Sequence, residues 1–151
     1  MKRSDLTHLN CSVARALDVV GEWWSLLVVR DVAYGRHRFG QIQESLGIAP
    51  NILSDRLTAL VGGGVLDRVP DPDDGRAVRY ELTAKGADLV PVLLALMAWG
   101  DRWESPDGPP LRLVDADGRT VEPALVDRRT GDPLDLEALR LRRGPGYRDG
   151  P

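Results

Sequence analysis

Residues 46–69 read LGIAPNILSDRLTALVGGGVLDRV, and this pattern predicts a helix over residues 49–62 that buries one face and exposes the other. Leu53, Leu57 and Leu60 recur at i, i+4 and i+7, which places them on one side. Gly47 indicates a tight turn before the helix, and Pro50 suits a first helical turn, where a missing N–H costs nothing. The opposite side carries small polar residues, namely Asn51, Ser54, Asp55 and Thr58.

Three glycines, Gly62 to Gly64, end this helix, and residues 65–69 then alternate apolar and polar as a half-buried strand does. A helix that follows a tight turn, presents hydrogen-bonding side chains and runs into a strand is typical of the recognition helix of a winged helix-turn-helix. Taken alone, the stretch also fits an ordinary core helix with a solvated outer face.

The composition is that of a globular protein rather than one that coats nucleic acid. The 151 residues carry a formal charge of −3, so any contact with DNA must come from a local basic surface. No apolar run approaches the length of a membrane span, and polar residues interrupt the start of the chain where a signal peptide would be apolar. The single cysteine, Cys11, cannot form an intrachain disulfide. We therefore expect a cytoplasmic protein with no membrane partner.

Three helices are predicted before the opening stretch. Residues 12–20 form the first, with Ser12 suited to its N-cap and Gly21 at its end. Residues 23–33 form a mostly apolar second helix, which is the expected core. Residues 39–46 form a third, and Gly47 joins it to the helix over 49–62 at the spacing of a helix-turn-helix.

A hairpin and a long helix are predicted after that stretch. Residues 65–69 and 77–82 alternate as two strands around the turn sequence PDPDDGR. Thr83 caps a helix that runs from residue 84 to about residue 103, and Pro91 should kink or split it. Apolar residues cover more than one side of this helix, so one side is expected to meet a second protomer.

From residue 104 the sequence changes to a proline-rich linker and a small appendage. Residues 111–114 and 120–126 flank a turn and predict a hairpin, a second turn spans 128–133, and a short segment spans 134–141. The last seven or so residues are expected to be loose. The predicted organisation is a winged helix-turn-helix domain for DNA binding and dimerisation over 1–103 and a C-terminal extension over 104–151.

Residues 9–103 resemble the HxlR-type winged-helix transcriptional regulators. The matching features are Cys11 before the first helix, Gly21 and Trp24 at the second, Arg38-Phe39 at the third, and the run LSDRL over 53–57. The resemblance implies a homodimer built from the first and last long helices. The wing looks more like that of the related MarR regulators, in which an aspartate, here Asp74, fixes an arginine, here Arg76. Trp23 and Asp55 depart from the family pattern, and the extension lacks the paired cysteines that some actinobacterial members carry there.

A DNA surface is assigned to the recognition helix and the wing. Asn51 and Arg56 suit base edges because their groups can bind bidentately, whereas phosphate contacts need only charge and reach. Asp55 either repels phosphate or accepts from a cytosine amino group. Each residue also fits an ordinary solvated surface. The predicted set is Pro50, Asn51, Ser54, Asp55, Arg56 and Thr58 in the major groove, Arg36, His37 and Arg38 on phosphates, and Arg76 and Arg79 on the wing.

Two further sites are predicted to control the protein. Cys11 precedes the first helix with Arg15 one turn on, which favours a redox-reactive thiolate; the alternative is an inert cysteine. Four tryptophans lie on or beside the helices expected to form the dimer, where they either pack the interface or line a pocket for a small apolar or aromatic effector. They are Trp23, Trp24, Trp99 and Trp103.

No catalytic, cofactor or metal site is predicted. The chain has no nucleophile, zinc-protease or dinucleotide motif, and the wing aspartates put Gly75 and Leu82 where a calcium loop needs ligands. We predict a mainly α fold with a small β-hairpin wing (α+β). The predicted function is that of a dimeric regulator, by default a repressor, which binds a pseudo-palindromic operator and is released by a small molecule or a redox signal. The alternative is a winged-helix module for protein interaction or effector binding.

Overall fold

The computed structural model describes residues 9–147. The chain divides into two compact units, Met1–Val90 and Pro91–Pro151. This division precedes the boundary predicted after residue 103, because the long predicted helix is interrupted just before Pro91. Two predictions concern residues outside the described ones. They are the absence of a signal peptide, which falls on residues 1–8, and part of the loose C-terminal end, which falls on residues 148–151.

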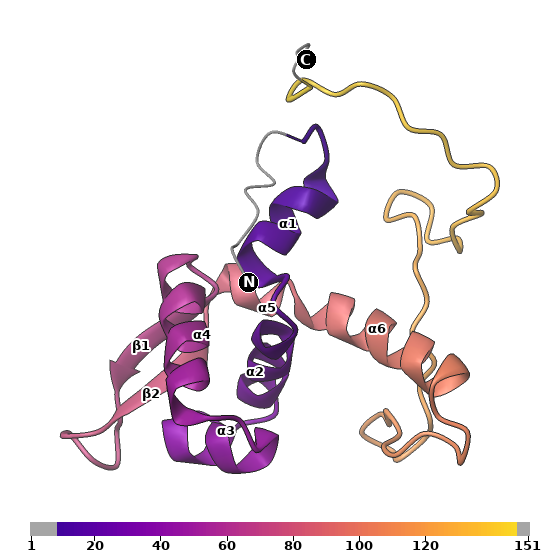
Figure 1. Cartoon of the computed structure of the whole chain (residues 1–151). Helices are drawn as coiled ribbons and strands as arrows, with labels where there is room; N and C mark the ends of the chain where they lie inside the picture. Colours follow the sequence, from indigo (N-terminus) through magenta and orange to yellow (C-terminus); the bar gives the residue numbers. More distant parts are fainter. Residues whose placement is uncertain (1–8, 148–151) are drawn as a thin grey trace. The chain divides into compact units, whose positions relative to one another are not determined.

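The first unit is a winged helix-turn-helix, as the sequence predicts. The helices and strands predicted up to residue 82 are confirmed to within one residue at each end, because apolar periodicity marks their spans. Figure 1 shows α4 beside the hairpin, with α2 and α3 next to it. The elements are α1 (Ser12–Val20), α2 (Trp23–Ala33), α3 (Phe39–Leu46), α4 (Pro50–Gly62), β1 (Leu66–Pro70), β2 (Val78–Leu82) and α5 (Ala84–Ala87).

The core of this unit lies between α2, α3, α4 and the start of β1. Burying each leucine or isoleucine in it contributes about 1.5–3 kcal/mol. The helix α2 is apolar on several sides because it packs against α1, α3 and α4. The predicted inward side of α4 is confirmed. The largest buried apolar side chains are Val28 and Val29 of α2, Ile42 of α3, Leu53, Leu57 and Leu60 of α4, and Leu66 of β1, with Val65 just before it.

The wing is an antiparallel pair in which Leu66 lies opposite Leu82 and Arg68 opposite Tyr80. Side chains alternate between the two faces of a strand, so Arg68 lies on the same face as the buried Leu66. The N–H of Asp71 donates to the carbonyl of Ala77 at 3.0 Å. Backbone groups also alternate, so the nitrogen of the preceding residue, Pro70, faces away from β2.

Three local details mark the ends of these elements. Gly47 has a φ of 60°, a left-handed conformation that favours glycine, in the turn between α3 and α4. The hydroxyl oxygen of Thr83 caps α5, as predicted. The prediction of Ser12 as the N-cap is wrong. The carbonyl of Cys11 accepts from the N–H of Arg15, so Cys11 is the N-cap and Ser12 is the first residue of α1.

The second unit contains most of α6 (Val90–Trp103) and the extension. The helix predicted over residues 84–103 is split into α5 and α6, as Pro91 predicts, since proline has no N–H to continue the preceding helix. None of residues 91–147 is buried. Within the described residues no helix is long and apolar enough to cross a membrane.

The hairpin predicted in the extension is present as a turn closed by one isolated bridge, between Val114 and Thr120. Asp115 forms the turn, because its carboxylate accepts from the N–H groups of Asp117 and Arg119. A second isolated bridge closes the next turn, and residues 134–141 form no helix or strand. With no buried side chain on either face, little stabilises a longer ladder.

Candidate nucleic-acid interface

The outer face of α4 is exposed and chemically unengaged. Asn51, Ser54, Asp55 and Thr58 are all exposed, as the helical spacing predicts. Pro50 is also exposed, at the first position of the helix. Within residues 9–147 none of the four polar side chains has a hydrogen bond or an ion pair. Their donors and acceptors are therefore available to a partner.

Arg56 differs from these four residues. It follows Leu53 by three positions and precedes Leu60 by four, which turns it toward the buried side of the helix. Its side chain is 24% exposed, and its Nη1 lies 3.9 Å from Oε2 of Glu22 at the start of α2. Its Nε is buried without a partner. We therefore assign Arg56 to the contact between α4 and α2 and leave it out of the exposed polar face.

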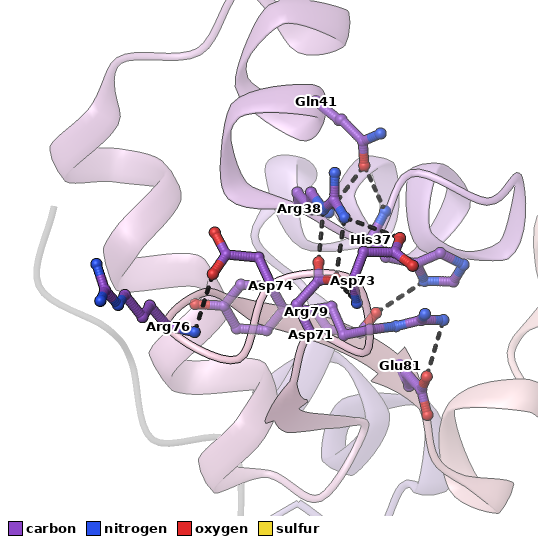
Figure 2. A network of polar contacts seen from close by, with 10 residues as sticks. His37, Arg38, Gln41, Asp71, Asp73, Asp74, Arg76, Arg79 and Glu81 are labelled. Atoms are coloured by element: carbon purple, nitrogen blue, oxygen red, sulfur yellow. Dashed lines mark hydrogen bonds and ion pairs between the residues drawn. The ribbon is translucent and has the colours of Figure 1, made fainter.

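The wing is tied to α3 by an arginine fork, shown in Figure 2. Arg38 donates from Nε and Nη2 to the two carboxylate oxygens of Asp71, at 2.5 and 2.9 Å, and from Nη2 to Asp73 at 3.1 Å. Asp71 is buried, and its Oδ1 also accepts from the N–H of Asp73 at 2.9 Å. Planar fork-to-carboxylate pairs combine strength with a defined geometry. This contact holds the turn of the wing, just after β1, against the start of α3.

The same pair shifts the acid–base properties of both groups. The hydrogen bond from Arg38, followed by that from the N–H of Asp73, holds the pKa of the Asp71 carboxyl well below its usual range, although burial acts in the opposite direction. The hydrogen bond and charge of Asp71 raise the pKa of Arg38. Both groups therefore remain charged at neutral pH, and the fork persists there.

His37 and Gln41 complete this junction. The side-chain oxygen of Gln41 accepts from the N–H groups of His37 and Arg38, at 3.1 and 3.0 Å, and so fixes the start of α3. The carbonyl of His37 accepts from the N–H of Tyr80 at 2.8 Å, and its ring Nδ1 lies 2.9 Å from the Tyr80 carbonyl. His37 thus occupies both the N–H and the carbonyl of Tyr80 on the outer edge of β2.

The other predicted arginines differ in whether their side chains form ion pairs. Nη1 of Arg36 lies 3.7 Å from the buried carboxylate of Asp31. Arg79 pairs with Glu81 at 2.8 Å. The predicted contact between Asp74 and Arg76 is made through the backbone, because the Asp74 carboxylate accepts from the N–H of Arg76 at 3.0 Å. Within the described chain the Arg76 guanidinium has no partner.

One basic residue at this surface is missing from the predicted set. Arg68 of β1 is exposed and lines a hollow between α4 and the wing strands, together with Ser54, Thr58 and Tyr80. The sequence does contain a signal for it, since Arg68 occupies the strand position two residues after Leu66 and so shares its face. Locating it next to α4 required the packing of the hairpin.

The two predicted control sites lie apart from this surface in the sequence. Trp23 and Trp24 belong to the first unit, where Trp23 is 78% exposed, and Trp99 and Trp103 belong to the second, where both are exposed. A hollow of about 540 Å³ in the second unit, between α6 and the turn at residues 109–123, is lined by none of them. Cys11 is exposed at the N-cap of α1.

No metal site is found among residues 9–147, where no three histidine, cysteine, aspartate or glutamate side chains are close enough to hold an ion. The three wing aspartates have other partners. Asp71 and Asp73 bind Arg38, and Asp74 binds the backbone of Arg76. The arrangement at α4 and the wing is that of a binding surface.

Comparisons with known proteins all identify similar proteins that are helix-turn-helix or transcription regulators. The family described as HxlR-like helix-turn-helix matches residues 19–108. An uncharacterized HTH-type transcriptional regulator of Mycobacterium bovis is 40% identical over 152 aligned residues, which cover 98% of this chain and 96% of that protein. The crystal structure of PA1607, a candidate transcription factor, is similar with a TM-score of 0.84 and 43% identity, covering 93% of this chain and 100% of that one.

A third similarity covers a smaller share of the chain. The reduced form of the transcriptional regulator YodB from Bacillus subtilis has a TM-score of 0.54 and 29% identity, and the match covers 65% of this chain and 98% of that one. The family match likewise ends at residue 108, whereas the Mycobacterium bovis protein and PA1607 also match most of the extension.

Proposed function

The chain belongs to the HxlR-like helix-turn-helix family of transcriptional regulators, and from this premise we propose that it is a homodimeric repressor of a pseudo-palindromic operator. One α4 reads each half-site from the major groove, and the wing, residues 70–79, lies against the neighbouring backbone and minor groove. The two half-sites are spaced by about one helical turn, 10–10.5 bp, or by a multiple of it. A small ligand releases the operator.

The observation that carries this proposal is the unengaged polar face of α4 beside a wing that is tied in place. Asn51 offers an amide that can bind adenine bidentately, and Asp55 offers an acceptor for a cytosine amino group. Arg76 adds an exposed cation on the wing. The Arg38 fork sets the position of the wing before DNA arrives, so less order has to be imposed on binding.

Exposed apolar side chains on α1 and α6 support the dimer. On α1, Val13 is 66% exposed and Leu17 is 48% exposed. On α6, Leu96 and Trp99 are both more than half exposed, and the helix has no buried residue. Exposed apolar side chains that are neighbours on one helix, as on α1 and on α6, mark interaction sites in soluble proteins, and twofold dimers are the commonest assembly.

Two signals are proposed for release, and both act on the dimer helices. The first is a small apolar or aromatic ligand bound by the predicted tryptophans, either Trp23 and Trp24 of the first unit or Trp99 and Trp103 of the second. It shifts the dimer only if it binds one spacing of the recognition helices better than the other. The second is oxidation of Cys11, which is exposed at the start of α1; the solved structure of the relative YodB is described as its reduced form. We favour the ligand, because Arg15 is the only activating charge near Cys11 in the sequence.

The proposal is tested by titrating genomic fragments with the full chain at two salt concentrations. A regulator selects particular fragments, and its affinity falls as salt rises because phosphate contacts release counterions. A clean dimer that prefers no fragment even at low salt would instead identify a protein-interaction module, the alternative that the net acidity and Asp55 suggested.

Variants of the surface refine that test on a selected fragment. Asn51→Ala is expected to lose roughly 1–3 kcal/mol of discrimination at one base pair, because a bidentate base contact is removed. Arg76→Ala should weaken binding evenly on all sequences, because it removes a backbone contact that carries no sequence information. An equal loss on every sequence for Asn51→Ala would show that α4 does not read bases.

A further inference from the structure

We infer that the hollow between α4 and the wing strands seats a phosphate of the DNA backbone, bound by Arg68 with the hydroxyl groups of Ser54 and Thr58. The inference rests on the proposed function and deepens it, because it separates the residues of α4 that read bases from those that hold the backbone.

The shape of the hollow suits a group that enters from solvent. It has a volume of about 340 Å³. Leu57 and Val61 contribute apolar surface from α4, and both Ser54 and Thr58 are exposed at its rim. On the other side are Arg68 and Tyr80, which lie directly opposite each other in the hairpin. The helix α4 and the hairpin that follows it in the chain thus form the two walls.

The charge of the hollow is positive and uncompensated. Arg68 has no hydrogen bond or ion pair within the part of the chain that the structure describes. By contrast, Arg38 and Arg79 each lie within 3 Å of a carboxylate oxygen. The nearest acidic residues of the hairpin, Asp67 and Glu81, alternate onto its opposite face. No carboxylate lines the hollow to neutralise Arg68.

The geometry of duplex DNA directs a phosphate to this place. In every duplex a sugar-phosphate strand separates the major groove from the adjacent minor groove. If α4 lies in the major groove and the wing tip lies in the next minor groove, that strand must pass between α4 and the hairpin. The space between α4 and the hairpin contains the hollow, so the passing strand brings a phosphate to Arg68. Arginine and hydroxyl side chains are common donors to phosphate oxygens.

This assignment divides the polar face of α4 into two functions. Ser54 and Thr58 are four residues apart and line the hollow, so their hydroxyl groups donate to the backbone. Asn51 and Asp55 do not line it and remain for base edges. Changes at Thr58 should therefore alter affinity on all sequences, whereas changes at Asn51 should alter selectivity.

The first experiment measures binding of Arg68→Gln to a fragment that the wild-type chain selects, over a range of salt. Each neutralised phosphate contributes a slope of about −0.9 in log K against log salt, so losing one contact per protomer lowers the affinity of that protomer roughly eightfold at 0.1 M salt but only about twofold at 0.5 M. Arg128→Gln is the matched control, since it removes the same charge from an exposed arginine of the extension. It should leave the slope unchanged.

A second experiment identifies the phosphate itself. Single phosphates of the fragment are replaced in turn by uncharged methylphosphonates. At one position in each half-site the penalty of Arg68→Gln should vanish, because the contact is already lost. Thr58→Val, which keeps the shape and removes the hydroxyl, should weaken binding by the same factor on selected and unselected fragments.

The outcomes separate this inference from the proposed function. If the wild-type chain selects a fragment but Arg68→Gln keeps its affinity and salt slope, the phosphate seat is wrong and the regulator stands. It is equally wrong if no methylphosphonate position couples to Arg68. If the wild-type chain selects no fragment, the proposed function itself fails. A base-specific loss for Thr58→Val would return that residue to the base-reading group.

Discussion

The helices α2 and α6 are both built mainly from apolar residues, yet they end in opposite environments. Five of the 11 residues of α2 are buried, whereas none of the 14 residues of α6 is. α2 packs against α1, α3 and α4 of its own unit. An apolar pattern therefore indicates that a helix buries its side chains against a partner, but it does not indicate whether that partner is in the same chain. In this protein the first unit provides its own core, and we propose that α6 obtains its cover from a second protomer.

The largest expected effect is the loss of dimer stability when Leu96 on α6 is replaced with aspartate. Leu96 is 51% exposed on α6. Burying the exposed half of a leucine contributes about 0.8–1.5 kcal/mol, and an unpaired carboxylate in the same place costs at least as much again. A twofold dimer contains the site twice, so the loss is roughly 3–6 kcal/mol of dimer stability. Sedimentation equilibrium should show the variant as a monomer. Leu125→Asp, at an exposed leucine of the extension, is the matched control. An unchanged dimer constant for Leu96→Asp would remove α6 from the interface.

A core substitution in the first unit comes next in size. Leu53→Ala should lower the free energy of unfolding by about 2–5 kcal/mol, because the cavity lies in a fully packed region. Urea denaturation followed by circular dichroism measures this change. The neighbouring Ile52 is 37% exposed, so Ile52→Ala should cost far less. Equal losses at the two positions would contradict a self-contained core on the inner side of α4.

The arginine fork should make the stability of the first unit depend on pH. The pKa of Asp71 is lowered below its ordinary value of 3.8 in the folded state. The contribution of the fork is therefore complete above that ordinary value and is lost as pH falls through the folded pKa. In urea unfolding, the difference between the wild-type chain and Asp71→Asn should be constant from pH 6 to about pH 4, and from there to pH 2 the wild-type chain should lose stability more steeply. Parallel curves would mean that the fork adds no net stability.

The smallest expected effect concerns Cys11. Under the ligand hypothesis, oxidant should act alike on operator complexes of the wild-type chain and of Cys11→Ser, as a mobility-shift assay would show. Release from the wild type alone would make Cys11 the sensor. That result would locate the switch at α1, in the unit that forms its own core, rather than at the tryptophans of both units.

The sequence predicts most of the first unit because its information is local. The spacing of Leu53, Leu57 and Leu60 marks the buried side of α4, and strand alternation locates β1 and β2. Gly47 and Thr83 also function as their residue types suggest. These signals depend on neighbours within a few positions, which one sequence displays in full.

The contacts that define the site are harder to predict, because they join distant segments. Arg38 and Asp71 are 33 residues apart, and nothing in their local sequence pairs them. Arg38 is therefore predicted as a phosphate contact, although its fork binds the wing. Arg56 belongs to a predicted recognition motif, yet its helical position turns it toward Glu22. Arg68 is distinguished by having no carboxylate partner, and this becomes visible only when the three-dimensional structure shows which arginines form ion pairs.

The pairing of His37 with β2 has a consequence for how the protein behaves at high concentration. A two-stranded hairpin has two edges, and an open edge is a template on which strands of other chains can grow into fibrils. On the β2 edge the N–H of Tyr80 already donates to His37. On the β1 edge Pro70 offers no N–H, and the charged residues Asp67 and Arg68 precede it. An incoming strand finds no continuous ladder on either side, so the wing can remain thin and exposed without seeding aggregation.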